Sequence, residues 1–304
     1  MDRSTRLAWW VISWNVITIL LGAVVRATHS GAGCGRSWPT CRGELLPELA
    51  GATTIEYIHR ATSGVALLLV AILVIHVFRS RPPGNSARKA AAWAGGAIVG
   101  EALIGAAIVI YEWVGSDDSL ARVVSVPLHL VNTLLLLGSL TLTAWFLNGG
   151  GSLQRRTGLR WLVVGGGALM LITTTGAVTA LADTLFPVAG LADQDATHFL
   201  TRLRVAHPLL AVTAVVAALL AARARGFQPL NLVRWVLTLS VFQLGLGGLN
   251  VLLATPLWLQ ILHLAVADSI WIAYVWLTAQ ILASDSASAV GSSTGARQVN
   301  PLHR

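Results

Sequence analysis

The sequence has few charged residues. Asp, Glu, Lys and Arg make up 11% of its 304 residues, whereas soluble globular proteins carry about 25%. So little charge cannot cover a water-exposed surface, which excludes a cytosolic enzyme, a nucleic-acid-binding protein and a disordered chain. Sulfur ligands for a soft metal are also scarce, because the chain has two Met and two Cys. What remains abundant is apolar sequence, at 55% hydrophobic residues and a mean hydropathy of +0.70, which predicts a polytopic membrane protein.

Eight apolar runs are each long enough to cross a membrane as a helix. None shows the alternation of a transmembrane β-strand. The predicted spans are Leu7–Val25, Tyr57–Phe78, Ala90–Tyr111, Val123–Leu147, Leu159–Leu181, Leu203–Ala222, Leu232–Leu253 and Leu257–Leu282.

The net charge of +8 is informative through its placement. Basic residues gather in the loops after the second, fourth and sixth spans, and the alternate loops are acidic or balanced. By the positive-inside rule both termini and the even loops are cytoplasmic, and the odd loops face out. The basic loop residues are Arg79, Arg81, Arg88, Lys89, Arg155, Arg156, Arg160, Arg223, Arg225 and Arg234.

The two cysteines, Cys34 and Cys41, both lie in the first outward loop. An outward loop meets an oxidising compartment, which favours a disulfide between two nearby thiols. Two free thiols are the alternative, and a zinc site is disfavoured because a C-x6-C pair lacks close ligand spacing.

The sequence contains an internal repeat. The second and sixth spans share a pattern around His59 and His207, and the fourth and eighth open with PLHL and PLWLQILHL. Each half holds an even number of spans, so both have one topology and are related by an axis along the membrane normal. We therefore expect an all-α membrane protein of two pseudo-symmetric four-helix bundles. The halves are residues 1–150 and 151–283, followed by a disordered cytoplasmic tail over 284–304.

Four histidines occupy matched positions near the outer ends of the even spans. They are His59, His129, His207 and His263, and the rise of about 1.5 Å per residue puts all four in the outer half of the membrane. A lone intramembrane histidine is often only a hydrogen-bonding group, but four in two repeats indicate a function. Paired imidazoles on facing helices of a bundle suit the axial positions of haem iron.

Polar neighbours of these histidines are candidates for supporting roles. Glu56 lies one turn before His59 and is either a proton acceptor or charge stabiliser at a reaction centre or a solvated helix-start acid. Asn132 and Gln260 lie three residues from His129 and His263 and are expected to orient the imidazoles. Glu101 sits mid-span and is expected to form an interhelical hydrogen bond. Asp268 is expected to face the bundle interior.

Several further residues have no single assignment from sequence. Outer arginines either pair with haem propionates or snorkel toward lipid headgroups. Of the remaining histidines, one is an interface residue near the end of the second span, two in outer loops are rim groups or have no role, and one lies in the tail. These residues are Arg60, Arg122, Arg202, Arg204, His29, His76, His198 and His303.

Taken with these motifs, the sequence resembles the heme A synthase family. The resemblance rests on Arg26-Ala-Thr-His-Ser-Gly31 leading to Cys34, on Trp38-Pro-Thr-Cys41, on Glu56-Tyr-Ile-His59-Arg60, and on the three later histidines. The sequence departs from the family at Gly35-Arg36-Ser37, where a Pro-Asp pair is expected, and at Pro208, which follows His207 in place of an arginine.

The resemblance implies oxidation of the C8 methyl group of haem O to a formyl group through a hydroxylated intermediate. It implies a b-type haem held by His207 and His263, a haem O site formed by His59, His129 and Arg60, Glu56 as the catalytic carboxylate, and a Cys34–Cys41 disulfide. The implied partners are a heme O synthase, the assembly of a terminal oxidase and membrane lipid, with a homo-oligomer as an option, in the cell (inner) membrane.

Two other classes of function are open from the residues alone. A bis-histidine b-type cytochrome that transfers electrons, for instance to a quinone, accounts for the histidines but leaves Glu56 and the cysteine loop without a role. A haem transporter or delivery protein accounts for the repeat, but transporters usually break their helices at mid-membrane.

Overall fold

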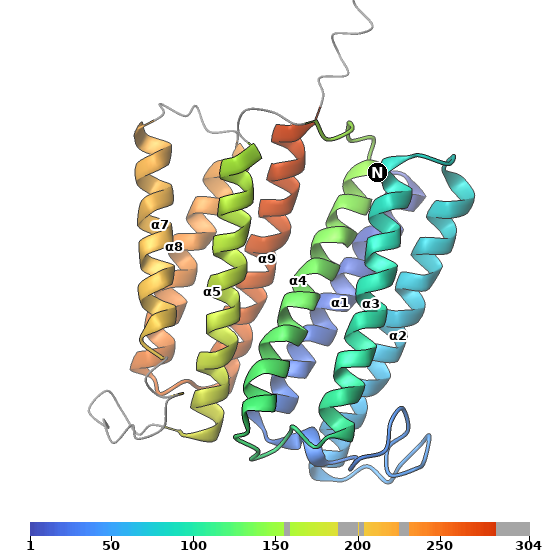
Figure 1. Ribbon diagram of the computed structural model, residues 1–304, viewed down its shortest axis with the longest axis vertical. Coiled ribbons are helices and arrows are strands. Elements are labelled where there is room, and N and C mark those ends of the chain that lie inside the picture. Colours follow the sequence, from blue (N-terminus) through green and yellow to red (C-terminus); the bar gives the residue numbers. More distant parts are fainter. Residues whose placement is uncertain (155–158, 188–199, 201–203, 225–230, 284–304) are drawn as a thin grey trace, which may run out of the picture.

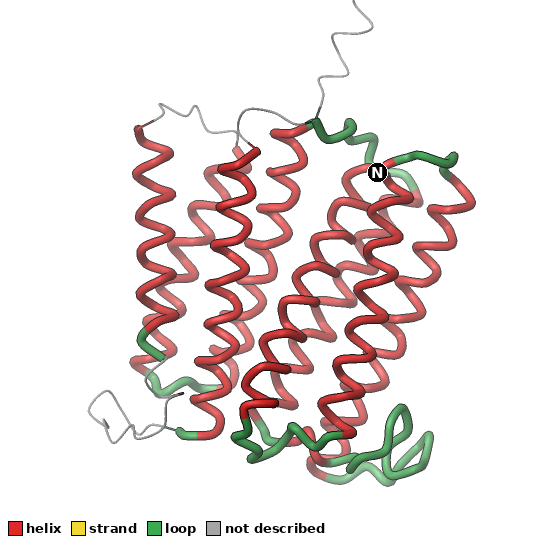
Figure 2. Tube along the Cα trace, in the orientation of Figure 1, coloured by secondary structure: helices red, strands yellow, loops and turns green. Residues whose placement is uncertain are grey.

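The computed structural model describes residues 1–154, 159–187, 200, 204–224 and 231–283. Over these ranges the chain is helical and contains no β-strand (Figure 2). The helices are α1 (Arg3–Ala27), η1 (Ser30–Ala32, a 3₁₀ turn), α2 (Gly51–Ser80), α3 (Ser86–Ile110), α4 (Leu120–Leu147), α5 (Leu159–Leu185), α7 (Ala206–Ala224), α8 (Asn231–Leu252) and α9 (Leu257–Leu282).

Each of the eight predicted spans corresponds to one of these helices. Seven are long and apolar enough to cross a membrane, and α7 contains a shorter apolar stretch, Ala206–Leu219, among the residues described. The eighth predicted span agrees with α9 at both ends, and the others differ by a few residues. The chain is therefore an all-α protein with the composition of a multi-pass membrane protein.

The helix starts follow from local chemistry. Asp2 accepts the backbone N–H of Thr5 at 2.7 Å and caps α1. Asn85 caps α3 by accepting from Ala87 at 2.9 Å. These side chains satisfy backbone donors that the first helical turn leaves free.

The helices lie in two groups (Figure 1). Helices α1–α4 stand together on one side, and α5, α7, α8 and α9 stand on the other. Contacts between the groups run from α4 and α1 to α9 and α5. One such contact is the hydrogen bond from Trp271 Nε1 on α9 to the Leu134 carbonyl on α4, at 2.7 Å.

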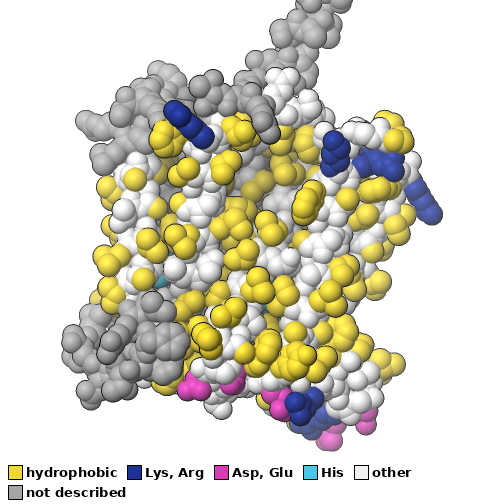
Figure 3. Space-filling view, in the orientation of Figure 1, with side chains coloured by type: hydrophobic (Ala, Val, Ile, Leu, Met, Phe, Trp, Pro, Cys, Tyr) yellow, Lys and Arg dark blue, Asp and Glu magenta, His cyan; other side chains and the backbone are white. Residues whose placement is uncertain are grey.

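Small and branched residues fill the core of the first group. Ala8, Val70, Ala91 and Leu140 are among its fully buried members. Large apolar side chains cover the outside instead, as the hydrophobic surface in Figure 3 shows. Trp93, for example, is 76% exposed. A soluble monomer does not expose apolar surface on this scale, so the outer surface is suited to lipid.

The two ends of the helix array differ in charge. The N-terminus and the end of α9 lie at the same end (Figure 1), where the link between α4 and α5 hydrogen-bonds α9 through Gln154 N and the Leu282 carbonyl at 2.9 Å. In the face that Figure 3 shows, the charged side chains visible at this end are Lys and Arg, whereas Asp and Glu gather at the opposite end, next to a smaller cluster of Lys or Arg. The loop containing both cysteines is at that opposite end.

Candidate functional site

Each of the four matched histidines lies against a glycine on a neighbouring helix. A methyl carbon placed on the glycine would approach the imidazole Cε1 to between 3.0 and 3.9 Å. In the closest of these pairs, any side chain larger than hydrogen would press on the ring. The pairs are Gly22–His59 at 3.0 Å, Gly105–His129 at 3.9 Å, Gly176–His207 at 3.0 Å and Gly247–His263 at 3.4 Å.

His207 on α7 and His263 on α9 lie close together in the second helix group. Their ring centres are 6.3 Å apart and their planes cross at 83°. Two axial metal–nitrogen bonds of about 2 Å, plus about 1 Å from each nitrogen to its ring centre, give a separation of about 6 Å. The spacing of this pair therefore fits a haem iron held between the two rings.

One ring of this pair is oriented by the backbone. His207 Nδ1 lies 3.0 Å from the Ile172 carbonyl on α5 and 3.4 Å from Thr175 Oγ1. Such a bond fixes the ring and leaves Nε2 for a metal. His263 Nδ1 is buried and has no hydrogen-bond partner among the described residues.

The other two histidines, His59 on α2 and His129 on α4, belong to the first group. His129 Nδ1 lies 3.0 Å from Glu101 Oε2 on α3, at ion-pair distance but outside the angular range of a hydrogen bond. Glu101 Oε1 accepts hydrogen bonds from Asn132 Nδ2 at 2.7 Å and Thr133 Oγ1 at 3.1 Å. These two bonds between α3 and α4 confirm the interhelical role expected of Glu101.

The expectation that Asn132 and Gln260 orient imidazoles is wrong. Asn132 Nδ2 is taken by Glu101 and by the Ala97 carbonyl. Gln260 Nε2 donates to the Thr255 carbonyl at 2.6 Å, while its oxygen accepts from Arg26. Both amides lie near a histidine in sequence, but helix packing directs their polar atoms to other partners.

Glu56 is buried at 2% exposure and is held from two sides. Its Oε2 accepts the backbone N–H of Cys34 at 2.7 Å. Its Oε1 accepts Nε of Arg60 at 3.0 Å and also Nη2 of the same guanidinium. A carboxylate in this setting is a fixed, paired anion rather than a solvated helix-start acid.

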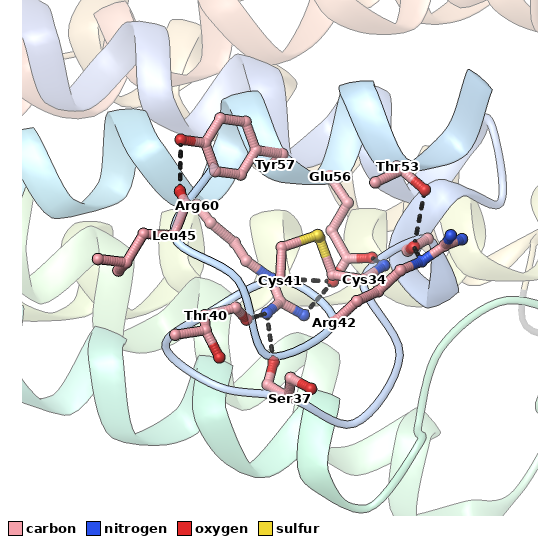
Figure 4. The surroundings of a disulfide bond; sticks show 11 residues. Cys34, Ser37, Thr40, Cys41, Arg42, Leu45, Thr53, Glu56, Tyr57 and Arg60 are labelled. Carbon is pink, nitrogen blue, oxygen red and sulfur yellow. Dashed lines mark hydrogen bonds and ion pairs between the residues drawn. A yellow bond between two sulfur atoms is a disulfide. The ribbon is translucent and has the colours of Figure 1, made fainter. Parts of the chain in front are cut away.

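Arg60 connects that carboxylate to the loop between α1 and α2 that contains both cysteines. Its Nη1 donates to the carbonyl oxygens of Ser37 and Thr40, as Figure 4 shows. All three nitrogens of the guanidinium, Nε, Nη1 and Nη2, therefore donate hydrogen bonds to acceptors within the protein.

The loop between α1 and α2 is closed by a disulfide between Cys34 and Cys41, as expected (Figure 4). Close backbone packing seats the loop on the start of α2. A methyl group on Gly33 would come 2.5 Å from the Ala52 carbonyl carbon, and Thr53 Oγ1 donates to the Gly33 carbonyl at 2.9 Å. Only glycine permits this approach.

Arg26, at the end of α1, is a residue to which the sequence alone assigned no role. Its Nη2 donates to Gln260 Oε1 on α9 at 2.8 Å, and its Nη1 donates to Thr184 Oγ1 on α5. It therefore links the two helix groups, one turn beyond Gly22. The signal in the sequence was a basic residue inside an outer helix end.

The other polar candidates have local partners where they are described. Arg122 donates to the Gly115 and Asp117 carbonyls, both at 2.7 Å, and Arg204 pairs with Asp183 at 2.7 Å.

His29 contacts the Gly115 carbonyl, and His76 contacts Ser4 Oγ at 2.9 Å. Asp268 is buried, as expected, without a hydrogen-bond partner among the described residues. Arg202, His198, His303 and the predicted tail 284–304 lie outside the described residues.

Comparison with known proteins places the chain among cytochrome oxidase assembly proteins. The family model COX15-CtaA, described as cytochrome oxidase assembly protein, matches residues 5–54 and 48–275. Heme A synthase of Geobacillus thermodenitrificans is 30% identical over 86% of this chain and 87% of its own length. Heme A synthase of Bacillus mycoides is 40% identical over 36% of each chain.

A further relative carries a different name. Protoheme IX farnesyltransferase of Thermus thermophilus is 44% identical over 92% of this chain, which spans 49% of that relative's length. The chain thus covers about half of this curated relative. With four matched histidines, the loop disulfide and a family model that matches most of its length, the chain belongs to the heme A synthase (COX15-CtaA) family of cytochrome oxidase assembly proteins.

Proposed function

We propose that this protein oxidises the C8 methyl group of haem O to a formyl group, through a hydroxylated intermediate, to give haem A. The observation that carries the proposal is the close pair His207–His263, with ring centres 6.3 Å apart. It occurs in one helix group, while the other group holds the second pair of matched histidines and the buried Glu56, which is one helical turn before His59. Two histidine pairs of one design, with Glu56 one turn before His59 and Arg204 at the matched place before His207, suit an enzyme that holds one haem and acts on another.

The proposed division of labour follows the two halves. His207 and His263, in residues 151–283, hold a b-type haem, and His59 and His129, in residues 1–150, hold haem O. When bound, the haem supplies the redox chemistry. The protein orients the rings through the Ile172 carbonyl and Glu101, and its apolar helices exclude water from both sites. In this proposal the halves are the two pseudo-symmetric bundles predicted from the repeat.

Glu56 acts in the proposed site as a fixed negative charge. Both of its oxygens already accept hydrogen bonds, from Cys34 and Arg60, so it suits stabilising positive charge better than taking up a proton. Preorganised charge at the place where charge develops is a large source of rate enhancement. Arg60 serves the haem O site through Glu56, because its donors hold that carboxylate and the loop.

The relatives named farnesyltransferase raise prenyl transfer as a second activity. The chain aligns with only 49% of their length, whereas it aligns with 87% of a relative named heme A synthase. The near full-length match supports assigning the methyl oxidation to this chain. The farnesylated haem O that it consumes is then supplied by a separate heme O synthase, and haem A passes on to terminal oxidase assembly.

The charge difference between the two ends of the helix array supports an orientation. We propose that the arginine-rich end, with both termini, faces the cytoplasm and that the disulfide loop faces out across the cell membrane.

Extraction of haems from cells tests the function. The gene is expressed with and without a heme O synthase in a host that makes no haem A, and extracted haems are separated by reversed-phase chromatography with mass detection. We expect haem A and its hydroxylated precursor only when both genes are present. Haem O as the sole product of the pair would overturn methyl oxidation. Haem O made by this chain alone would instead show prenyl transfer.

A further inference from the structure

The two helix groups differ in what touches a ligand imidazole at Nδ1. In the first helix group a carboxylate oxygen, Glu101 Oε2, lies 3.0 Å from His129 Nδ1. In the second group His207 Nδ1 meets a neutral backbone carbonyl, that of Ile172, also at 3.0 Å. The two halves of the repeat thus share their histidines but differ in the charge of the group next to the imidazole Nδ1.

The position equivalent to Glu101 in the second half confirms the difference. It is Gln243 on α8, whose Nε2 donates to the His263 backbone carbonyl at 2.9 Å and whose Oε1 has no partner among the described residues. An amide therefore stands where the first half has an acid, and it bonds the backbone rather than the ring.

Glu101 is held so that its second oxygen stays on the ring. Oε1 is used by Asn132 and Thr133 from α4, and Oε2 is left for His129 one turn before them. A methyl group on Gly100 would come 2.9 Å from Asn132 Oδ1, so the absence of a side chain at this glycine leaves the space that the amide occupies. Three residues of α4 converge on one carboxylate, which makes the contact a built feature and not a chance approach.

A carboxylate behind a ligand imidazole changes the metal as well as the ring. At ion-pair distance its negative charge stabilises positive charge on the imidazole, which makes the ligating nitrogen a stronger donor and favours the more oxidised state of the iron. A backbone carbonyl does the same more weakly because it carries no net charge.

We propose that Glu101 tunes the haem site of the first half: through His129 it lowers the reduction potential of an iron bound there, relative to the site of His207 and His263. Glu101 is a positioning residue, because it acts through His129. The inference rests on the proposed function for the presence of two haem sites, and it names the residue that makes them unequal.

The test is a spectroelectrochemical titration of purified, haem-loaded protein. Wild type should show two midpoint potentials, which His59→Ala and His207→Ala assign by each removing one. Glu101→Gln keeps an acceptor for Asn132 and Thr133 but removes the charge, and it should shift the first-half potential upward while the second-half potential stays fixed. The matched control is Glu112→Gln, which removes an exposed carboxylate from the loop that follows α3 and should move neither potential.

A second variant guards against loss of the site. Glu101→Asp retains the charge and should give a potential closer to wild type than Glu101→Gln does. Unchanged potentials in Glu101→Gln, or loss of first-half haem in both variants with second-half haem retained, would overturn tuning by Glu101. A wild-type protein that binds no haem in the first half would instead contradict the proposed function itself.

Discussion

Gly176 on α5 and His207 on α7 are in direct apposition: a methyl group on the glycine would lie 3.0 Å from the imidazole Cε1. The same relationship recurs at Gly22 and His59, at the same 3.0 Å, in the other helix group. Each half of the repeat therefore contains the histidine and also a glycine, without a side chain, on the neighbouring helix opposite it. This gives the glycines a role beyond close helix approach.

Gly176→Ala should displace His207 and lower the content of the second haem. The added methyl overpacks the contact by a few tenths of an ångström, at a typical cost of about 1–3 kcal/mol. Gly167→Ala is the matched control on the same helix, because a methyl there has open space within 4 Å. Haem per protein, measured as the pyridine haemochrome, should fall in the first variant only. An equal fall in both variants would show that the Gly176–His207 contact does not position the histidine for haem.

Glu56→Gln should abolish most methyl oxidation while leaving the His207–His263 haem spectrum intact. The amide cannot supply the negative charge that Arg60 and the Cys34 N–H hold in place, and loss of such a group lowers turnover by about 10²–10³-fold. Haem A per cell, relative to protein measured by immunoblot, provides the readout. Turnover within a factor of two of wild type would remove Glu56 from the site.

Arg26→Ala should weaken the contact between the two helix groups. It removes charged hydrogen bonds to Gln260 on α9 and Thr184 on α5, each worth about 1.5–3 kcal/mol. Thermal unfolding in detergent should shift clearly downward. Arg36→Ala, which breaks an exposed 3.5 Å pair with Glu112, should cost no more than about 1 kcal/mol. Similar shifts in the two variants would argue against an interface role.

The disulfide allows a direct test of orientation. In intact spheroplasts a membrane-impermeant maleimide should label nothing until an impermeant phosphine reduces the Cys34–Cys41 bond, after which two labels per chain should appear. A cysteine introduced by Ser80→Cys in a chain lacking both natural cysteines should be labelled only after permeabilisation. The reverse pattern would invert the proposed topology.

Much of the fold could be predicted from the sequence. All eight apolar spans became helices, and Leu257–Leu282 agrees at both ends, because span length and hydropathy are local properties. The histidine positions were equally readable, since each repeats at a matched place. The partners of Asn132 and Gln260 were not, because residues three apart share a helix face but their polar atoms bond whichever neighbouring helix packs there.

The sequence by itself determined that this is a helical membrane protein with four matched histidines and two cysteines in one loop between helices. Only the tertiary structure decided that the ring centres of His207 and His263 are 6.3 Å apart and that the Glu101 carboxylate lies on the His129 ring. It also decided that Glu56 accepts hydrogen bonds from both Cys34 and Arg60. The physical reason is the separation along the chain of the residues that interact. Helix formation in lipid depends on each segment's own backbone and side chains, whereas these contacts join residues on different helices or loops and exist only once the helices have packed.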